Sequence, residues 1–195
     1  MNAKLYTTGL AIALAGVARA QQPPAVAQAN PITAAFKARL LYFHGNIAQA
    51  FDSIPASKFD YKPTPAQLTI GFIAQHVASD NYTFCNTFGA MKANVPDADV
   101  STPDSVKAMW PKEQLVSKVK ASFAFCAQAM GQLADATLGD SVSLVYGGSK
   151  RSTTRITTLL IHALDLADHY SQLANYMRLN NLVPPSALPR PKRGK

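Results

Sequence analysis

Four long segments with apolar residues at helical spacing constrain the fold of this chain more than any other feature. In each segment, apolar side chains recur every three or four residues, which predicts an amphipathic helix with one buried face. Turn-rich stretches with proline separate the segments, and strand signals are few. The helices are expected over residues 30–53, 69–89, 112–135 and 152–180. Four helices of this length predict an all-α four-helix bundle with long inter-helix loops.

Specific residues mark the ends of these helices. Asn30 followed by Pro31 is typical of an N-cap with proline at the first helical position. Asn181 can end the last helix, and two prolines shortly after it forbid continuation. Residues 141–150 alternate in polarity and contain Gly-Gly, which predicts a short hairpin or an extended loop. A short helical turn is also expected over residues 106–110.

Residues 1–20 have the pattern of a secretory signal peptide. A lysine at Lys4 precedes a short apolar run, and small residues at Ala18 and Ala20 form a cleavage site. The run is too short to span a membrane, so we predict cleavage after Ala20 and a flexible leader over residues 21–29. An uncleaved anchor is the alternative. We expect a soluble exported protein, in the periplasm or secreted.

The basic charge is concentrated at the two ends of the chain. The formal net charge is +8, and it falls to +6 without the predicted signal peptide. Four further basic residues lie in the tail, residues 187–195, which leaves about +2 on the predicted bundle. A nucleic-acid-binding domain needs a basic face on the folded domain, so we expect no nucleic-acid partner. The tail is expected to be disordered, with solvation or weak adhesion to anionic lipid or polymer as its role.

The chain contains two cysteines, Cys85 and Cys126, both in predicted helices. An even cysteine count in an exported chain indicates a disulfide, which here would link two helices. Two buried free thiols are the alternative.

A polar stripe interrupts the last predicted helix. Residues three, four and seven apart share a helical face, so His162, Asp165 and His169 project together, and the stripe continues into Gln172 and Tyr176. Each buried polar group left without a partner costs about 1–3 kcal/mol. The stripe therefore either faces water or coordinates something.

The second predicted helix supplies a partner for this stripe. His76 follows an apolar run there, and with Asp165 and His169 it would complete a set of two histidines and one carboxylate. Such a set binds Zn²⁺, Fe²⁺, Ni²⁺ or Mn²⁺ and leaves positions open for water or substrate. A hydrogen-bonded core histidine is the plainer interpretation of His76. For His44, in the first helix, a surface or core position is expected.

Two stretches carry a resemblance to a known family: KPTPAQLTIGFIAQHVASDNYTFC, residues 62–85, and HALDLADHYSQLANYMRLNNLVPPSALPR, residues 162–190. They resemble the DinB-like (DinB/bacillithiol-transferase-like) superfamily of metal-binding four-helix bundles. The resemblance implies a bundle domain over residues 30–186, with His76 as the first histidine ligand and His169 as the last. It also supports the disulfide, because exported relatives tend to carry cysteines at both positions.

Asp165 departs from the family pattern, because a histidine is usual at that position. If the aspartate ligates, the set is harder and more anionic, which shifts preference from Zn²⁺ or Ni²⁺ toward Fe²⁺ or Mn²⁺. His162 is a possible substitute ligand. The third alternative is a lost site in which Asp165 only pairs with His169. Asp80 and Gln172 are predicted to orient the ligands from outside.

The resemblance implies a metal-dependent hydrolase or transferase of unknown substrate, and it leaves open whether the chain is an enzyme. Transfer of bacillithiol belongs to a cytosolic thiol pool, so an exported member is expected to use another small molecule. One alternative is a non-catalytic bundle in the cell envelope that binds a small ligand and has a degenerate metal site. Another is an interaction protein, for which a homodimer is plausible.

Overall fold

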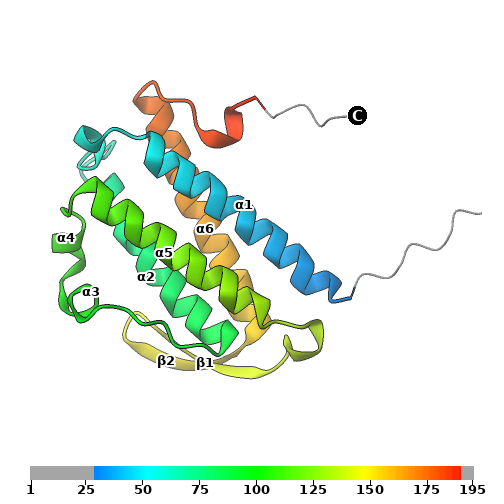
Figure 1. The fold of residues 1–195 in the computed structure, drawn as a ribbon. Coiled ribbons are helices and arrows are strands. Elements are labelled where there is room, and N and C mark those ends of the chain that lie inside the picture. The colour runs from blue at the N-terminus through cyan, green and yellow to red at the C-terminus, as the bar shows by residue number, and fades with distance from the viewer. Residues whose placement is uncertain (1–28, 190–195) are drawn as a thin grey trace, which may run out of the picture.

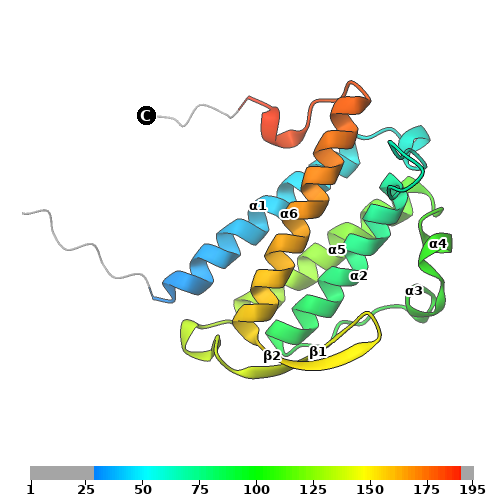
Figure 2. The same ribbon diagram turned by 180° about the vertical axis from the view of Figure 1, so that it is seen from behind.

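The computed structural model describes residues 29–189 and confirms the four-helix bundle (Figures 1 and 2). The predicted signal peptide and the basic residues of the tail lie outside the described residues. The long helices are α1 (Pro31–Ser53), α2 (Ile70–Gly89), α5 (Lys112–Gly131) and α6 (Arg155–Leu179). Within the described residues, no helix is both long and apolar enough to cross a membrane.

The four long helices surround one apolar core. α1 and α2 each contact both α5 and α6, so α1 and α2 occupy opposite corners of the bundle (Figures 1 and 2). Fully buried side chains from all four helices fill the centre, as the amphipathic patterns predict; they include Ile47, Ile73, Leu115 and Leu166. The predicted disulfide joins α2 to α5 through Cys85 and Cys126, both fully buried.

Short elements connect the long helices. α3 (Asp97–Ser101) and α4 (Asp104–Lys107) lie between α2 and α5. Single 3₁₀ turns occur at Ala56–Lys58, Asp135–Thr137 and Pro185–Ala187. α4 begins two residues before the predicted helical turn.

An antiparallel hairpin precedes α6, and its first strand packs against α2. It consists of β1 (Ser141–Tyr146) and β2 (Ser149–Thr154). Gly147 and Gly148 both adopt positive φ, as a tight hairpin turn requires, so the hairpin alternative is confirmed. The hairpin is longer than predicted, and α6 begins at Arg155, where the Thr154 hydroxyl accepts a hydrogen bond from the Thr157 amide.

The capping predictions can be compared with the start of α1 and the end of α6. Asn30 lies before α1, but its side chain does not cap that helix. Instead the Asp135 carboxylate accepts hydrogen bonds from the amides of Ile32 and Thr33, at 3.0 and 2.8 Å. α5 ends at Gly131, four residues before its predicted end, and Asp135 begins a separate 3₁₀ turn. At the other end, Asn181 adopts the left-handed conformation and terminates α6 as predicted.

Candidate metal centre

Three potential ligands from two helices meet near the middle of α2. His76 comes from α2, and Asp165 and His169 come from α6. One ligand atom from each lies within 4.8 Å of the others, and the two imidazole rings meet edge to face at 4.9 Å between centroids. We call this group the outer cluster. The 25-residue length of α6 and the four-residue spacing place Asp165 and His169 on one face toward α2.

The outer cluster is partly open to solvent. The side chains of His76 and Asp165 are 26% and 17% exposed, whereas that of His169 is 6% exposed. Asp165 Oδ1 lies 3.3 Å from His169 Nε2. Asp165 Oδ2 and His169 Nδ1 are buried and have no hydrogen-bond partner among the described residues. A divalent cation would satisfy the orphaned carboxylate oxygen, so these residues fit a metal ion of the kind that nitrogen and oxygen ligands bind.

Burial and the charge of Asp165 have opposite effects on the pKa of His169. Burial lowers the pKa of His169, but the hydrogen bond and the charge of Asp165 outweigh it, so the net pKa is raised. A raised histidine pKa means that a proton and a cation compete for the same imidazole. The outer cluster can therefore stabilise positive charge either as a proton on His169 or as a bound cation.

Asp80, which was predicted to orient a ligand, lies one turn along α2 from His76. Asp80 Oδ2 is 3.4 Å from His76 Nε2 and accepts a hydrogen bond from the Tyr146 hydroxyl at 3.0 Å. Burial raises the pKa of Asp80 and, together with the Asp80 charge, raises that of Tyr146 to about 12. Tyr146 is the residue that sequence reasoning missed, since only the hairpin brings it to α2.

The other predicted orienting residue, Gln172, makes a different contact. Its amide donates to the Asp168 carboxylate at 2.8 Å on the outer side of α6. The next residue of the polar stripe, Tyr176, donates to the carbonyl of Leu68. Gln172 and Tyr176 thus take other partners, Gln172 within α6 and Tyr176 just before α2, and neither contacts the outer cluster by a hydrogen bond.

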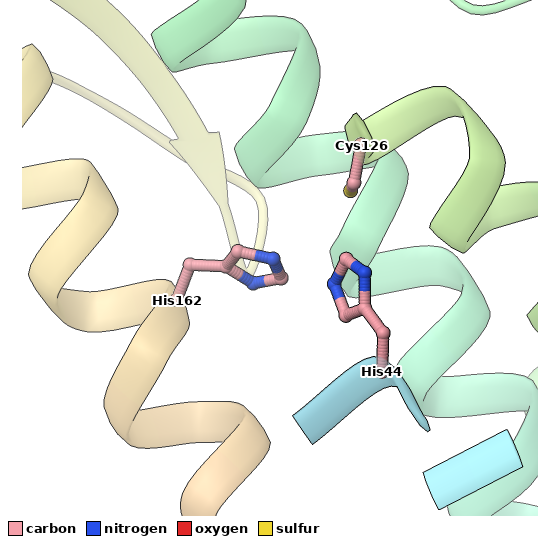
Figure 3. A group of neighbouring side chains, drawn as sticks. All are labelled: His44, Cys126 and His162. Atoms are coloured by element: carbon pink, nitrogen blue, oxygen red, sulfur yellow. The ribbon is translucent and has the colours of Figure 1, made fainter. Parts of the chain in front are cut away.

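His162, the possible substitute ligand, belongs to a second group instead. It lies with His44 and Cys126, one potential ligand atom of each being within 4.8 Å of the others. The three side chains point toward one another from α6, α1 and α5 (Figure 3). We call His44, His162 and the Cys85–Cys126 disulfide the inner cluster. His162 is buried in the core one turn before Asp165 on α6, so the structure does not bring it to His76.

A cavity of about 370 Å³ lies on another side of α2. Its lining includes Gln75, Tyr82 and Trp110 but none of the outer cluster. Gln75 is 4% exposed, and neither its amide nitrogen nor its amide oxygen has a hydrogen-bond partner among the described residues.

No family model matches the chain, and no curated protein matches it by sequence. Solved structures do match. A DinB-like protein from Bacillus cereus ATCC 10987 has a TM-score of 0.59 at 14% identity, over 77% of this chain and 93% of that one. A conserved protein from Enterococcus faecalis has a TM-score of 0.55 at 16% identity, over 76% and 96%.

A histidine-to-alanine mutant of a mycothiol-dependent maleylpyruvate isomerase is also similar. Its TM-score is 0.57 at 11% identity, over 72% of this chain and 60% of the isomerase. At these identities the likeness concerns the fold.

Proposed function

We propose that this chain, which has the DinB-like helical-bundle fold, binds one divalent transition-metal ion through His76, Asp165 and His169. The observation that carries the proposal is the convergence of three ligand atoms from α2 and α6 within 4.8 Å, next to a buried carboxylate oxygen without a partner. One carboxylate with two imidazoles suits Fe²⁺ or Mn²⁺ as well as Zn²⁺ or Ni²⁺.

The chemistry that follows is metal-dependent hydrolysis or group transfer on a small molecule. A bound ion at this site would act as a Lewis acid and lower the pKa of a coordinated water or thiol. Asp165 holds the imidazole of His169, and Asp80, itself held by Tyr146, faces that of His76. His76 and Asp165 are partly exposed, which would let a small molecule reach the ion from solvent. The mycothiol-dependent isomerase of the same fold supports a thiol or thiol adduct as one substrate class to test.

The buried disulfide supports an exported location. Disulfides persist in oxidising compartments and are rare in the cytosol. Cys85 and Cys126 are fully buried and paired, so the bond is part of the core rather than a surface feature.

Metal analysis of the full chain, purified without a chelator or a histidine tag, tests the proposal. We expect about one equivalent of a transition metal, or uptake of one equivalent from Zn²⁺, Fe²⁺, Ni²⁺ or Mn²⁺. Asp165→Asn and His76→Ala should lose it. Asp168→Asn is the matched control, since Asp168 is an exposed aspartate three residues along the same helix. A wild-type protein that binds none of the four ions, or an Asp165→Asn variant with full occupancy, would overturn the assignment.

A second candidate function is binding of a small ligand in the cavity beside α2. The buried amide of Gln75 offers one donor and one acceptor without partners, next to the aromatic rings of Tyr82 and Trp110. A planar ligand with an amide edge would satisfy both atoms. A thermal-shift screen of amides and pyrimidines tests this function, with Gln75→Leu expected to abolish any stabilisation by a compound that binds here.

A further inference from the structure

The inner cluster takes one residue from each of the four long helices. His44 lies on α1, Cys85 on α2, Cys126 on α5 and His162 on α6. His44, Cys126 and His162 each offer a ligand atom within 4.8 Å of the others, and Cys85 Sγ lies 3.8 Å from His162 Nε2 (Figure 3). Two sulfurs and two imidazoles therefore meet at the point where all four helices come together.

The two imidazoles of the inner cluster have free nitrogen atoms. His44 and His162 are 6% and 0% exposed, yet His44 Nε2 and His162 Nδ1 have no hydrogen-bond partner among the described residues. Burial lowers the pKa of His44 to about 3 and that of His162 to about 4, so both rings are neutral near pH 7. A neutral imidazole is the form that binds metal ions. An unpaired polar atom in the core is costly, and a cation bound to His44 Nε2 would remove that cost, while the His162 nitrogen that faces the sulfurs is Nε2.

We propose that cleavage of the Cys85–Cys126 disulfide converts the inner cluster into a zinc site with two cysteine and two histidine ligands. A dithiol is the reductant by class. The two sulfurs of the dithiol form a disulfide with each other as the Sγ–Sγ bond of the protein breaks. The two thiol protons of the dithiol pass to Cys85 and Cys126. Zn²⁺ then displaces these protons into solvent and binds both thiolates, together with His44 and His162.

After cleavage the two sulfurs must move apart, and the other ligand atoms already lie within 4.8 Å of one another. In a tetrahedral site with bonds of about 2.0–2.3 Å, neighbouring ligand atoms lie roughly 3.3–3.8 Å apart. The 3.8 Å separation of Cys85 Sγ and His162 Nε2 already lies at this limit. The same four residues would thus cross-link the helices by a covalent bond under oxidising conditions and by zinc under reducing conditions. This site is independent of the outer cluster, which contains no sulfur.

Cobalt titration of the full chain tests the site, because thiolate ligands give Co²⁺ a charge-transfer band in the near ultraviolet. The protein is reduced with a phosphine, which takes an oxygen atom from water as it reduces the disulfide and supplies no thiol. We expect the reduced protein to bind one more equivalent of Co²⁺ than the oxidised protein, with the sulfur band present only after reduction. Excess Zn²⁺ should remove the band.

Variants separate the two clusters. His44→Leu and His162→Leu should each abolish the sulfur band, whereas His76→Ala, which damages only the outer cluster, should leave it unchanged. If a histidine variant does not fold, the wild-type protein still gives a second test. In the reduced wild-type protein, Zn²⁺ should slow alkylation of both thiols by at least about tenfold. A reduced protein with two free thiols, no sulfur band and no protection by Zn²⁺ would overturn the proposal.

Discussion

The outer and inner clusters place histidines of the same helix in opposite chemical environments. His169 and His162 lie two turns apart on α6, yet the pKa of the first is raised and that of the second is lowered to about 4. Asp165 bonds to His169, whereas His162 is fully buried against the disulfide and aromatic rings. Both histidines are buried, so the difference comes from the carboxylate: Asp165 within bonding distance favours positive charge on His169, whereas burial beside sulfur opposes it on His162.

The comparison teaches that one helical stripe carries two different sites. The outer cluster can accept a cation with no change in covalent structure, because its ligand atoms already lie together and Asp165 is partly open to solvent. The inner cluster offers neutral nitrogen donors, and its sulfurs become ligands only as thiolates. Predictions that perturb one cluster should therefore leave the other intact.

Loss of the disulfide should give the largest change in the free energy of unfolding and should disrupt only the inner cluster. The bond closes a loop with a sequence separation of 41 residues. Replacing Cys85 and Cys126 with alanine should lower the free energy of unfolding by roughly 4 kcal/mol, from loss of the constraint on the unfolded chain. Chemical denaturation without reductant measures this difference.

Reduction provides the control for the disulfide prediction. With a reductant and a chelator present, the wild-type protein should be nearly as unstable as the double variant. Occupancy of the outer cluster, measured under conditions where both proteins are folded, should be the same in the two. An equal loss of metal in the double variant would show that the clusters are coupled.

Acid should weaken the inner cluster next most strongly, through His44. Its pKa falls from 6.5 in the unfolded chain to about 3 in the folded protein. Between pH 6.5 and pH 3, His44 is therefore protonated in the unfolded chain but not in the folded protein. The contribution of neutral His44 to the free energy of unfolding is fully present above pH 6.5 and is lost as the pH falls toward 3. At pH 5 the loss from His44 should be about 2 kcal/mol relative to pH 8.

The His44→Leu variant removes this titration and keeps an apolar side chain against Phe123, on which the imidazole stacks. Denaturation curves at pH 8 and pH 5 should show a smaller loss of stability in the variant than in the wild-type protein. His76→Ala, which alters the more exposed histidine of the outer cluster, should show no comparable gain at pH 5. Parallel pH dependences of wild type and His44→Leu would contradict the assignment of this loss to His44.

The sequence predicted the four helices because each buries a face whose apolar spacing is local. The sequence could not predict the inner cluster, because local spacing carries no information on contacts between helices. His44 and Cys126 lie on different helices, and helical spacing says which face a residue occupies but not what lies across the bundle. The cysteine count indicated the disulfide and the resemblance supported it, whereas the alternative ligand His162 lies in the inner cluster and not beside His76.

Three contacts that helical spacing does not show explain the rest of what was missed. Tyr146 reaches Asp80 only because β1 packs against α2, a contact between residues 66 positions apart. Asp135 caps α1 from even farther along the chain, so Asn30 did not show its predicted role. Gln172 was expected near the metal, but a nearer partner, Asp168, lies one turn earlier on its own helix.

A histidine at position 165 should sharpen the difference between the clusters. Asp165→His would give the outer cluster three imidazoles, a softer and less anionic set. We expect selectivity for Zn²⁺ over Mn²⁺ to rise by about tenfold, which corresponds to ~1.4 kcal/mol. Competition with a metal-binding indicator measures both affinities. Asp168→His, the same substitution at an exposed position, should leave the ratio unchanged, and an unchanged ratio in both variants would mean that residue 165 does not touch the ion.

The smallest expected effect concerns the hydrogen bond that ties the hairpin to the outer cluster. Tyr146→Phe removes the donor to Asp80 Oδ2 and keeps the ring that stacks on Phe84. Stability should fall by about 1 kcal/mol, the usual net contribution of one hydrogen bond. Metal affinity should fall by about tenfold or less, because Asp80 contacts His76 and is not itself in the proposed ligand set.

A matched tyrosine separates these two contributions. Tyr42→Phe makes the same change at an exposed position on α1, so it should alter neither stability nor metal affinity. If Tyr146→Phe lowers stability but leaves metal affinity at the level of Tyr42→Phe, the hydrogen bond holds the hairpin without orienting His76. If it lowers both, Asp80 transmits the position of the hairpin to the metal ligand. The hydrogen bond between Tyr146 and Asp80 includes no residue of the inner cluster, so the sulfur band of the reduced protein should be the same in all three proteins.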